Sequence, residues 1–151
     1  MSTNDKGSAG EFRILVVDDE ITVLEVMAEI LQAAGWKVDA LANGLEALQR
    51  VKRTRYDALV LDLYMPELPG LLLHSKVKFI DRELWGRTVF VSGHFSTEEL
   101  RRSLEGTPRF VSKPFKSESL VGTVGMALPE VPRAISEGTA SSRPDGKPVR
   151  S

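Results

Sequence analysis

Short apolar runs alternate along the chain with segments of helical spacing. Five runs rich in apolar and β-branched residues predict strands: RILVVD (13–18), KVDAL (37–41), ALVLDL (58–63), TVFVS (88–92) and RFVS (109–112). Between the first two runs, Leu24, Met27 and Leu31 follow the i, i+3, i+7 spacing of one helix face. The pattern therefore predicts strands that alternate with helices.

Helix start signals accompany this pattern. Thr22, Asn43 and Ser96 each precede a glutamate by three residues, a spacing in which the first side chain can accept a hydrogen bond from a backbone N–H of the first helical turn. The spacing is common by chance, so it adds only weak support to the three predicted helix starts.

The alternation of strands and helices predicts the fold. Strands joined by helices form βαβ units, and their right-handed crossovers place the strands parallel, with helices on both faces of the sheet. The first and third runs are nearly all apolar, as in central strands, whereas KVDAL (37–41) alternates and suits an edge. We expect an α/β, flavodoxin-like (βα)5 doubly wound parallel sheet with strand order 2-1-3-4-5.

Composition narrows the function classes. A chain of 151 residues with 42% hydrophobic and 27% charged residues suits one globular core. It has no cysteine, which excludes disulfide scaffolds and thiol catalysis, and no His or Cys set has zinc spacing. A net charge of -1 leaves no excess of positive charge of the kind that binds nucleic acid. The sequence also contains no signal peptide and no long apolar run. We expect a cytoplasmic protein with no direct nucleic-acid or membrane partner.

The chain divides into three segments by composition. Residues 1–11 are polar and predict a flexible N-terminal segment, and residues 12–128 hold the predicted domain. Residues 129–151 are rich in Pro, Ser and Gly without an apolar period, so we expect a disordered tail or linker with Arg133 solvated.

Acidic residues follow two of the predicted strands. Ligands of an open α/β sheet bind beyond the carboxyl ends of its strands, where the strand order reverses; here that place lies between the strands that precede Asp18–Asp19 and Asp62. A pair of like charges roughly 4 Å apart costs about 4 kcal/mol at an effective dielectric of about 20. A bound divalent cation reverses that repulsion, and Mg²⁺ prefers carboxylate and phosphate oxygens. These acids predict a magnesium site.

Ser92 and Lys113 close the other two strands of the same predicted edge. An ammonium group and a hydroxyl can both donate hydrogen bonds to a phosphoryl oxygen. Each residue alone also has a simpler explanation: the aspartates as helix caps or turn residues, Ser92 as a turn residue and Lys113 as a solvated charge. Their convergence on one edge favours a phosphoryl site.

These motifs resemble the receiver domain of two-component response regulators, of the chemotaxis-regulator type. The resemblance rests on Asp18–Asp19, DLYMPELPG (62–70), SGH (92–94) and FVSKPF (110–115), in this order at the strand ends, and covers roughly residues 12–128. It implies that Asp62 is the phosphoacceptor, a carboxylate nucleophile. The implied Mg²⁺ ligands are Asp18, Asp19, Asp62 and the backbone carbonyl of Tyr64.

The resemblance also assigns a switch. Lys113 would pair with the acceptor or the phosphoryl group, Ser92 would move to hydrogen-bond it, and Phe110 would take the place of the aromatic switch residue. Phe110 would couple phosphorylation to the face formed by the fourth helix, the fifth strand and the fifth helix, where a downstream protein or a second copy usually binds. The Lys113–Pro114 bond would be cis.

Three residues depart from the common family pattern. Tyr64 and His94 would flank the phosphoryl group, where a bulky pair could slow attack by water. Phe110 carries no hydroxyl where many members have Tyr, so its switch would rely on burial alone. His74 falls in a predicted helix and is expected to be partly buried or at the surface.

The resemblance implies a phosphoacceptor domain that takes a phosphoryl group from a histidine kinase or a phosphotransfer protein. Such a domain is no enzyme beyond self-catalysed phosphoryl acceptance and slow self-dephosphorylation. One alternative is a Mg²⁺-dependent phosphatase of the haloacid dehalogenase type, although that family separates its two Asp by one residue and this chain has an adjacent pair. The other is a receiver-like interaction module that is never phosphorylated.

Overall fold

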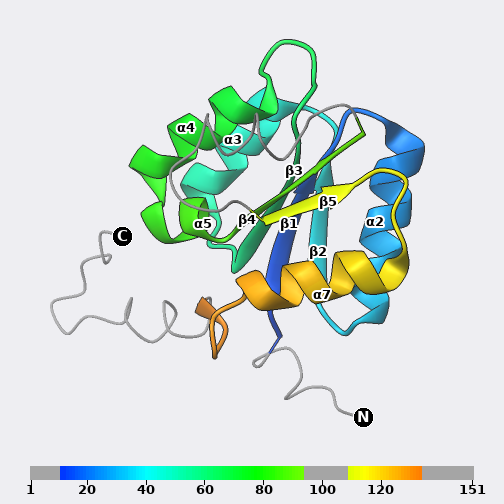
Figure 1. Cartoon of the computed structure of the whole chain (residues 1–151). Helices are drawn as coiled ribbons and strands as arrows, with labels where there is room; N and C mark the ends of the chain where they lie inside the picture. The colour runs from blue at the N-terminus through cyan, green and yellow to red at the C-terminus, as the bar shows by residue number, and fades with distance from the viewer. Residues whose placement is uncertain (1–10, 94–108, 134–151) are drawn as a thin grey trace, which may run out of the picture.

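The computed structural model describes residues 11–93 and 109–133 of the chain, and its five strands form one parallel sheet (Figure 1). The strands are β1 (Arg13–Val17), β2 (Lys37–Leu41), β3 (Ala58–Asp62), β4 (Thr88–Ser92) and β5 (Arg109–Ser112). Their order is β2-β1-β3-β4-β5, and every neighbouring pair is parallel. The predicted strand order and the flavodoxin-like doubly wound fold are confirmed.

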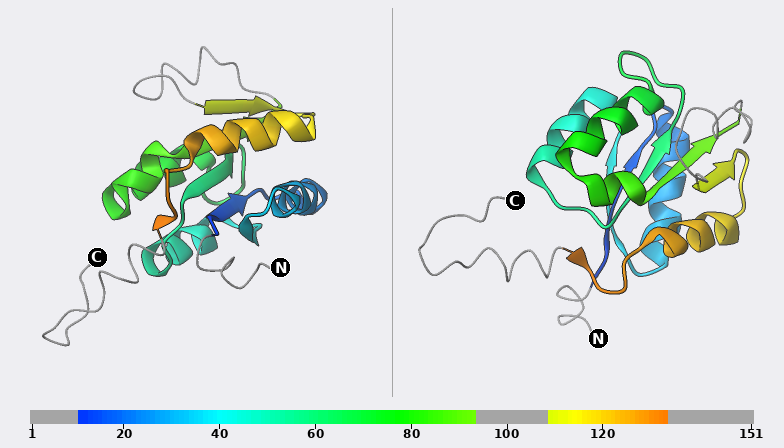
Figure 2. Two further views of the ribbon diagram at one scale, coloured as in Figure 1. Left: turned by 90° about the horizontal axis from the view of Figure 1, so that it is seen from below. Right: turned by 60° about the vertical axis from the view of Figure 1, so that its left-hand side comes forward.

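Helices cover both faces of this sheet (Figures 1 and 2). They are α2 (Ile21–Ala33), α3 (Gly44–Arg53), α4 (Gly70–Ile80), α5 (Arg82–Gly86) and α7 (Ser117–Ala127). Alternate residues of the central strands point to opposite faces, so Leu15 packs with α3, α4 and α5, while Val16 packs with α2 and α7. Burial on both faces explains why the β1 and β3 sequences are continuously apolar.

The helix starts agree only partly with the sequence signals. Asn43 caps α3, because its side chain accepts hydrogen bonds from Leu45 N at 2.7 Å and Glu46 N at 3.1 Å. The Thr22 prediction is wrong: α2 begins at Ile21 after Glu20, which makes no side-chain cap hydrogen bond. The Ser96 signal lies outside the described residues. A capping sequence needs the local backbone to present its N–H groups, which spacing alone does not ensure.

Two side chains are more buried than the sequence suggested. The expectation that Arg133 is solvated is wrong, since this residue is only 7% exposed. His74 is 4% exposed, stacks on Trp85 and lies 2.9 Å through Nε2 from the Trp85 carbonyl oxygen. Residues 1–10 and 134–151 fall outside the described part, so the proposed domain boundaries stay a prediction.

Among residues 11–93 and 109–133, no helix is both long and apolar enough to span a lipid bilayer.

Candidate functional site

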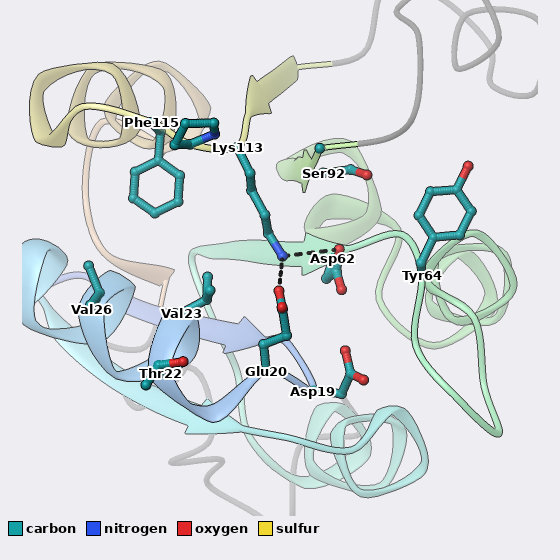
Figure 3. Close-up of a pocket in the computed structure, with 12 residues that line it drawn as sticks. Asp19, Glu20, Thr22, Val23, Val26, Asp62, Tyr64, Ser92, Lys113 and Phe115 are labelled. Atoms are coloured by element: carbon teal, nitrogen blue, oxygen red, sulfur yellow. Dashed lines mark hydrogen bonds and ion pairs between the residues drawn. The ribbon is translucent and has the colours of Figure 1, made fainter.

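The candidate residues meet at the carboxyl edge of the sheet. Asp62 and Ser92 close β3 and β4, Asp18 and Asp19 follow β1, and Lys113 follows β5. In a parallel sheet all of these positions lie at one edge. All of them except Asp18 line an open pocket of about 800 Å³, on whose walls Figure 3 shows Asp19, Asp62, Ser92 and Lys113.

Three carboxylates form the acidic part of this site. Asp18, Asp19 and Asp62 each place an oxygen within 4.8 Å of the others. Asp18 is fully buried and Asp62 is 5% exposed, whereas Asp19 is only partly buried. Burial, helped by the charges of Asp18 and Asp19, raises the pKa of Asp62 from 3.8 to about 6. Burial also raises the pKa of Asp18.

The Lys113 ammonium provides the positive charge in the cluster. Its Nζ lies 2.9 Å from Asp18 Oδ2, 3.0 Å from Glu20 Oε1 and 3.6 Å from Asp62 Oδ1. Burial alone would lower the pKa of this lysine, but its contacts with the Asp18 and Glu20 carboxylates leave the pKa raised. Three of the four acids at this site therefore lie within 4 Å of one ammonium, and the cluster retains an excess of negative charge.

The acidic cluster fits a divalent cation. Asp18 Oδ2 is buried and makes no hydrogen bond within the described part of the chain. Lys113 Nζ lies at ion-pair distance from this oxygen, 2.9 Å away, but outside hydrogen-bond geometry. A buried, unsatisfied carboxylate oxygen beside two further carboxylates is the donor set that Mg²⁺ prefers.

Glu20 is a site residue that sequence reasoning did not assign. Its side chain pairs with Lys113 at 3.0 Å, and its backbone N–H donates to Asp18 Oδ1 at 2.9 Å. The only sequence signal was its place as the third acid of VVDDE. Its partner lies 93 positions further along the chain, so no local pattern could identify the pair.

The pocket also has an apolar wall that the sequence did not reveal. Val23 and Val26 of α2 face Phe115, which follows the cis Lys113–Pro114 bond (Figure 3). Val26 is 48% exposed. The cis bond agrees with the sequence expectation. The pocket is therefore lined by charged side chains on one wall and by apolar side chains on another.

The remaining predicted residues are placed as follows. Ser92 is 2% exposed and Tyr64 is 50% exposed, both on the pocket wall. Phe110 is partly buried against the core on the α3–α4–α5 side. His94 lies outside the described residues, as does the segment expected to form the fourth helix of the fold. Of the proposed partner face, only β5 and α7 are described.

Comparison with known proteins assigns the chain to a family. The model of the response regulator receiver domain matches residues 14–125.

Two full-length relatives show the extent of the match. "Response regulator protein TodT" of Pseudomonas putida is 29% identical over 121 residues, covering 80% of this chain and 52% of that protein. "Transcriptional regulatory protein PrrA" of Mycobacterium leprae is 34% identical over 117 residues, covering 77% and 49%. The chain thus spans about half the length of these relatives.

A solved structure supports the same assignment. The receiver domain of NtrX from Brucella abortus superimposes with a TM-score of 0.69 at 30% identity, covering 76% of this chain and 97% of that one. The strand order, the clustered acids and the family match agree, and the chain belongs to the response regulator receiver domain family.

Proposed function

We propose that Asp62 is the phosphoacceptor of this receiver domain and accepts a phosphoryl group from a histidine kinase or a phosphotransfer protein. The observation that carries the proposal is the convergence of Lys113 and the three clustered carboxylates at the carboxyl edge of the sheet. Asp62 closes the central strand β3 and lies on the wall of the open pocket, from which a donor could reach it.

The reaction is a transfer between two nucleophiles. An Asp62 carboxylate oxygen would attack phosphorus, the bond from phosphorus to the donor's imidazole nitrogen would break, and that nitrogen would leave with the bonding pair and then take up a proton from solvent. The chain's contribution would be to hold the carboxylate in place and to offset charge on the phosphoryl oxygens with Lys113.

Mg²⁺ would bind through Asp18, Asp19 and Asp62, with the Tyr64 carbonyl as a further ligand. When bound, it would offset the negative charge of carboxylates and phosphate. Mg²⁺ would coordinate acids that now contact Lys113, and the phosphoryl group would be attached to one of them. Lys113 would therefore exchange some of these acidic partners for a phosphoryl oxygen.

The switch would pass through two further residues. Ser92, at the end of β4, would donate its hydroxyl hydrogen to a phosphoryl oxygen, and Phe110, on the neighbouring β5, would change its packing. A downstream protein or a second copy would then bind the face that includes β5 and α7. Self-dephosphorylation would be slow, with no turnover of other substrates.

The experiment that tests Asp62 is labelling by acetyl phosphate. With Mg²⁺ present, the native chain should gain one phosphoryl group by intact mass, and Asp62→Asn should gain none, because an amide oxygen is too weak a nucleophile. Glu29→Gln, at an exposed site on α2, is the matched control and should label normally. Labelling of Asp62→Asn at the native rate would refute the assignment.

Neither alternative function gains support. A phosphatase of the haloacid dehalogenase type would place its nucleophile after the first strand, whereas the buried acid that lines this pocket closes β3. A cytoplasmic location and the absence of a nucleic-acid partner stay predictions, the latter because one relative is named a transcriptional regulatory protein.

A further inference from the structure

The end of the described chain docks at the amino edge of the sheet, opposite the acidic pocket. Figures 1 and 2 show that the segment after α7 returns to the start of β1. There, Arg133 is 7% exposed, although the surrounding sequence is rich in proline and serine. A buried arginine is rare unless its charge is paired, so its surroundings need an explanation.

Every nitrogen of the Arg133 guanidinium has a partner. Nη1 donates to the Tyr56 carbonyl oxygen at 2.7 Å, Nη2 donates to Asp81 Oδ1 at 2.9 Å, and Nε lies 3.0 Å from Glu83 Oε1. Asp81 is itself largely buried and caps α5 by accepting from Leu84 N at 3.2 Å. The planar fork of arginine matches such a set of acceptors, which a lysine could satisfy only in part.

The backbone of Arg133 is held as firmly as its side chain. Its N–H donates to Asp57 Oδ1 at 2.6 Å, and the other oxygen of that carboxylate accepts from Arg13 N at 2.8 Å. Asp57 is fully buried. Without the residue at 133, a buried carboxylate oxygen would lose its hydrogen bond, which is costly. Asp57 therefore joins the start of β1 to the segment after α7.

These partners form what we call the guanidinium site. It comprises the Tyr56 carbonyl oxygen and the side chains of Asp81 and Glu83, while Asp57 holds the backbone N–H of Arg133. Two of its members carry negative charge, so an arginine side chain complements it in both charge and shape. The site unites the start of β3, the junction of α4 with α5 and the end of the described chain.

We propose that the guanidinium site has Arg133 as its built-in ligand and thereby fixes the point at which residues beyond 133 leave the receiver domain. Whatever follows Arg133 starts beside α5 at the amino edge of the sheet, away from the phosphoryl pocket. The inference does not depend on phosphoryl transfer, since no member of the guanidinium site lines that pocket.

Amide hydrogen exchange tests the anchor in the full chain. Arg133→Ala should lower the protection factor at position 133 by about tenfold or more, because the charge-assisted bonds that hold the segment are lost. The amide of Val60 in the β3 core should change much less. Arg87→Ala is the matched control: Arg87 pairs with the same Glu83 at 3.8 Å but makes none of the Arg133 contacts, so position 133 should keep its protection.

Arg133→Lys keeps the proposal testable if the alanine variant does not fold. Lysine retains the charge but only part of the contacts, so the loss of protection should be smaller yet measurable. An amide at position 133 that exchanges in the native chain at the rate of an unstructured peptide would overturn the proposal. Equal protection in the native chain and both variants would do so as well.

The fixed exit point has its own measurement. The chain has no cysteine, so Ser136→Cys gives a single attachment point for a paramagnetic label. Position 136 lies three residues from the anchor, at most about 11 Å of extended chain. The label should broaden amide signals of α5, and Arg133→Ala should remove most of that broadening. Unchanged broadening in the variant, or none in the native chain, would contradict a fixed exit.

Acetyl phosphate labelling separates this proposal from the function proposed above. A folded Arg133→Ala variant should label at Asp62 as the native chain does, because the two sites occupy opposite edges of the sheet. A chain that never labels but protects position 133 would refute only the phosphoacceptor role.

Discussion

Asp62 is a buried carboxylate whose charged form is disfavoured in the folded chain without metal. Its pKa rises from 3.8 to about 6, chiefly through burial and secondarily through the charge of Asp18. A carboxyl group with a raised pKa binds its proton more tightly when folded, so it lowers stability as pH increases from 3.8 to about 6. The residue that would perform the chemistry therefore weakens the fold at neutral pH.

Asp62→Asn should consequently stabilise the metal-free chain. Above pH 6 we expect an increase of roughly 1–3 kcal/mol in the free energy of unfolding, since one pKa unit corresponds to about 1.4 kcal/mol and residual solvent reduces the full effect. Below pH 3.8 the gain should vanish, because the native carboxyl is then neutral in both states. Urea unfolding in the presence of a chelator measures both limits.

Glu29→Gln serves as the comparison for that experiment, since it changes an exposed acid of α2 and should alter stability by less than about 0.5 kcal/mol. If Asp62→Asn were less stable than the native chain above pH 6, burial would not govern this carboxylate.

At the scale of single elements, the start of α4 is fitted closely to the end of β3. Gly70 begins α4, and its N–H donates to the Leu63 carbonyl oxygen at 2.9 Å. A Cβ at this position would lie 2.1 Å from the Asp62 carbonyl oxygen and 2.9 Å from Leu63 Cα. Both obstacles are backbone atoms, so no side-chain movement could relieve the overlap. The helix packs against the strand end that carries Asp62.

Gly70→Ala should therefore disturb both the fold and the site. We expect a loss of stability of about 1–3 kcal/mol or more from overpacking, together with slower labelling by acetyl phosphate because the end of β3 must shift.

Gly122→Ala is the matched control within α7: nothing lies within 4 Å of its added Cβ, and alanine in a helix interior should raise stability by about 1 kcal/mol. Thermal unfolding of both variants and of the native chain measures these changes in stability. Equal stability of Gly70→Ala and the native chain would show that α4 can move away from β3.

At the scale of the whole molecule, the two edges of the sheet carry different charge arrangements. The carboxyl edge has four acids and one lysine, and the buried Asp18 Oδ2 lacks a hydrogen bond within the described part of the chain. The amino edge has Arg133 matched with its carboxylates. Only the carboxyl edge therefore stands to gain from a divalent cation.

Mg²⁺ should stabilise the native chain by mass action. At a concentration of about 100 times the dissociation constant, we expect about 2.7 kcal/mol, provided that the unfolded chain does not bind. Asp18→Asn should reduce this gain, because it removes a charged ligand from the cluster. Thermal unfolding at constant ionic strength with MgCl₂ or NaCl is the measurement. A gain that is the same with either salt, or unaffected by Asp18→Asn, would exclude binding at the acidic cluster.

Much of the fold and the site could be predicted because their signals are local. The sequence of β3, which includes Leu59 and Leu61, is continuously apolar. Such a run predicts a central strand buried on both faces even when the neighbouring strands are not known. Parallel connection then fixes the edge at which Asp62 and Lys113 meet. The sequence alone determined the strand order, the acid cluster and the lysine beside it.

Only the tertiary structure decided which charges pair across the chain. The Glu20–Lys113 ion pair spans 93 positions, and the contact of Arg133 with Asp57 spans 76. Neither leaves a periodic trace, since each depends on two distant backbones arriving at one edge of the sheet. Periodicity reports which face of an element is buried, whereas a specific polar contact also requires the relative placement of the elements, and that is set when they pack together.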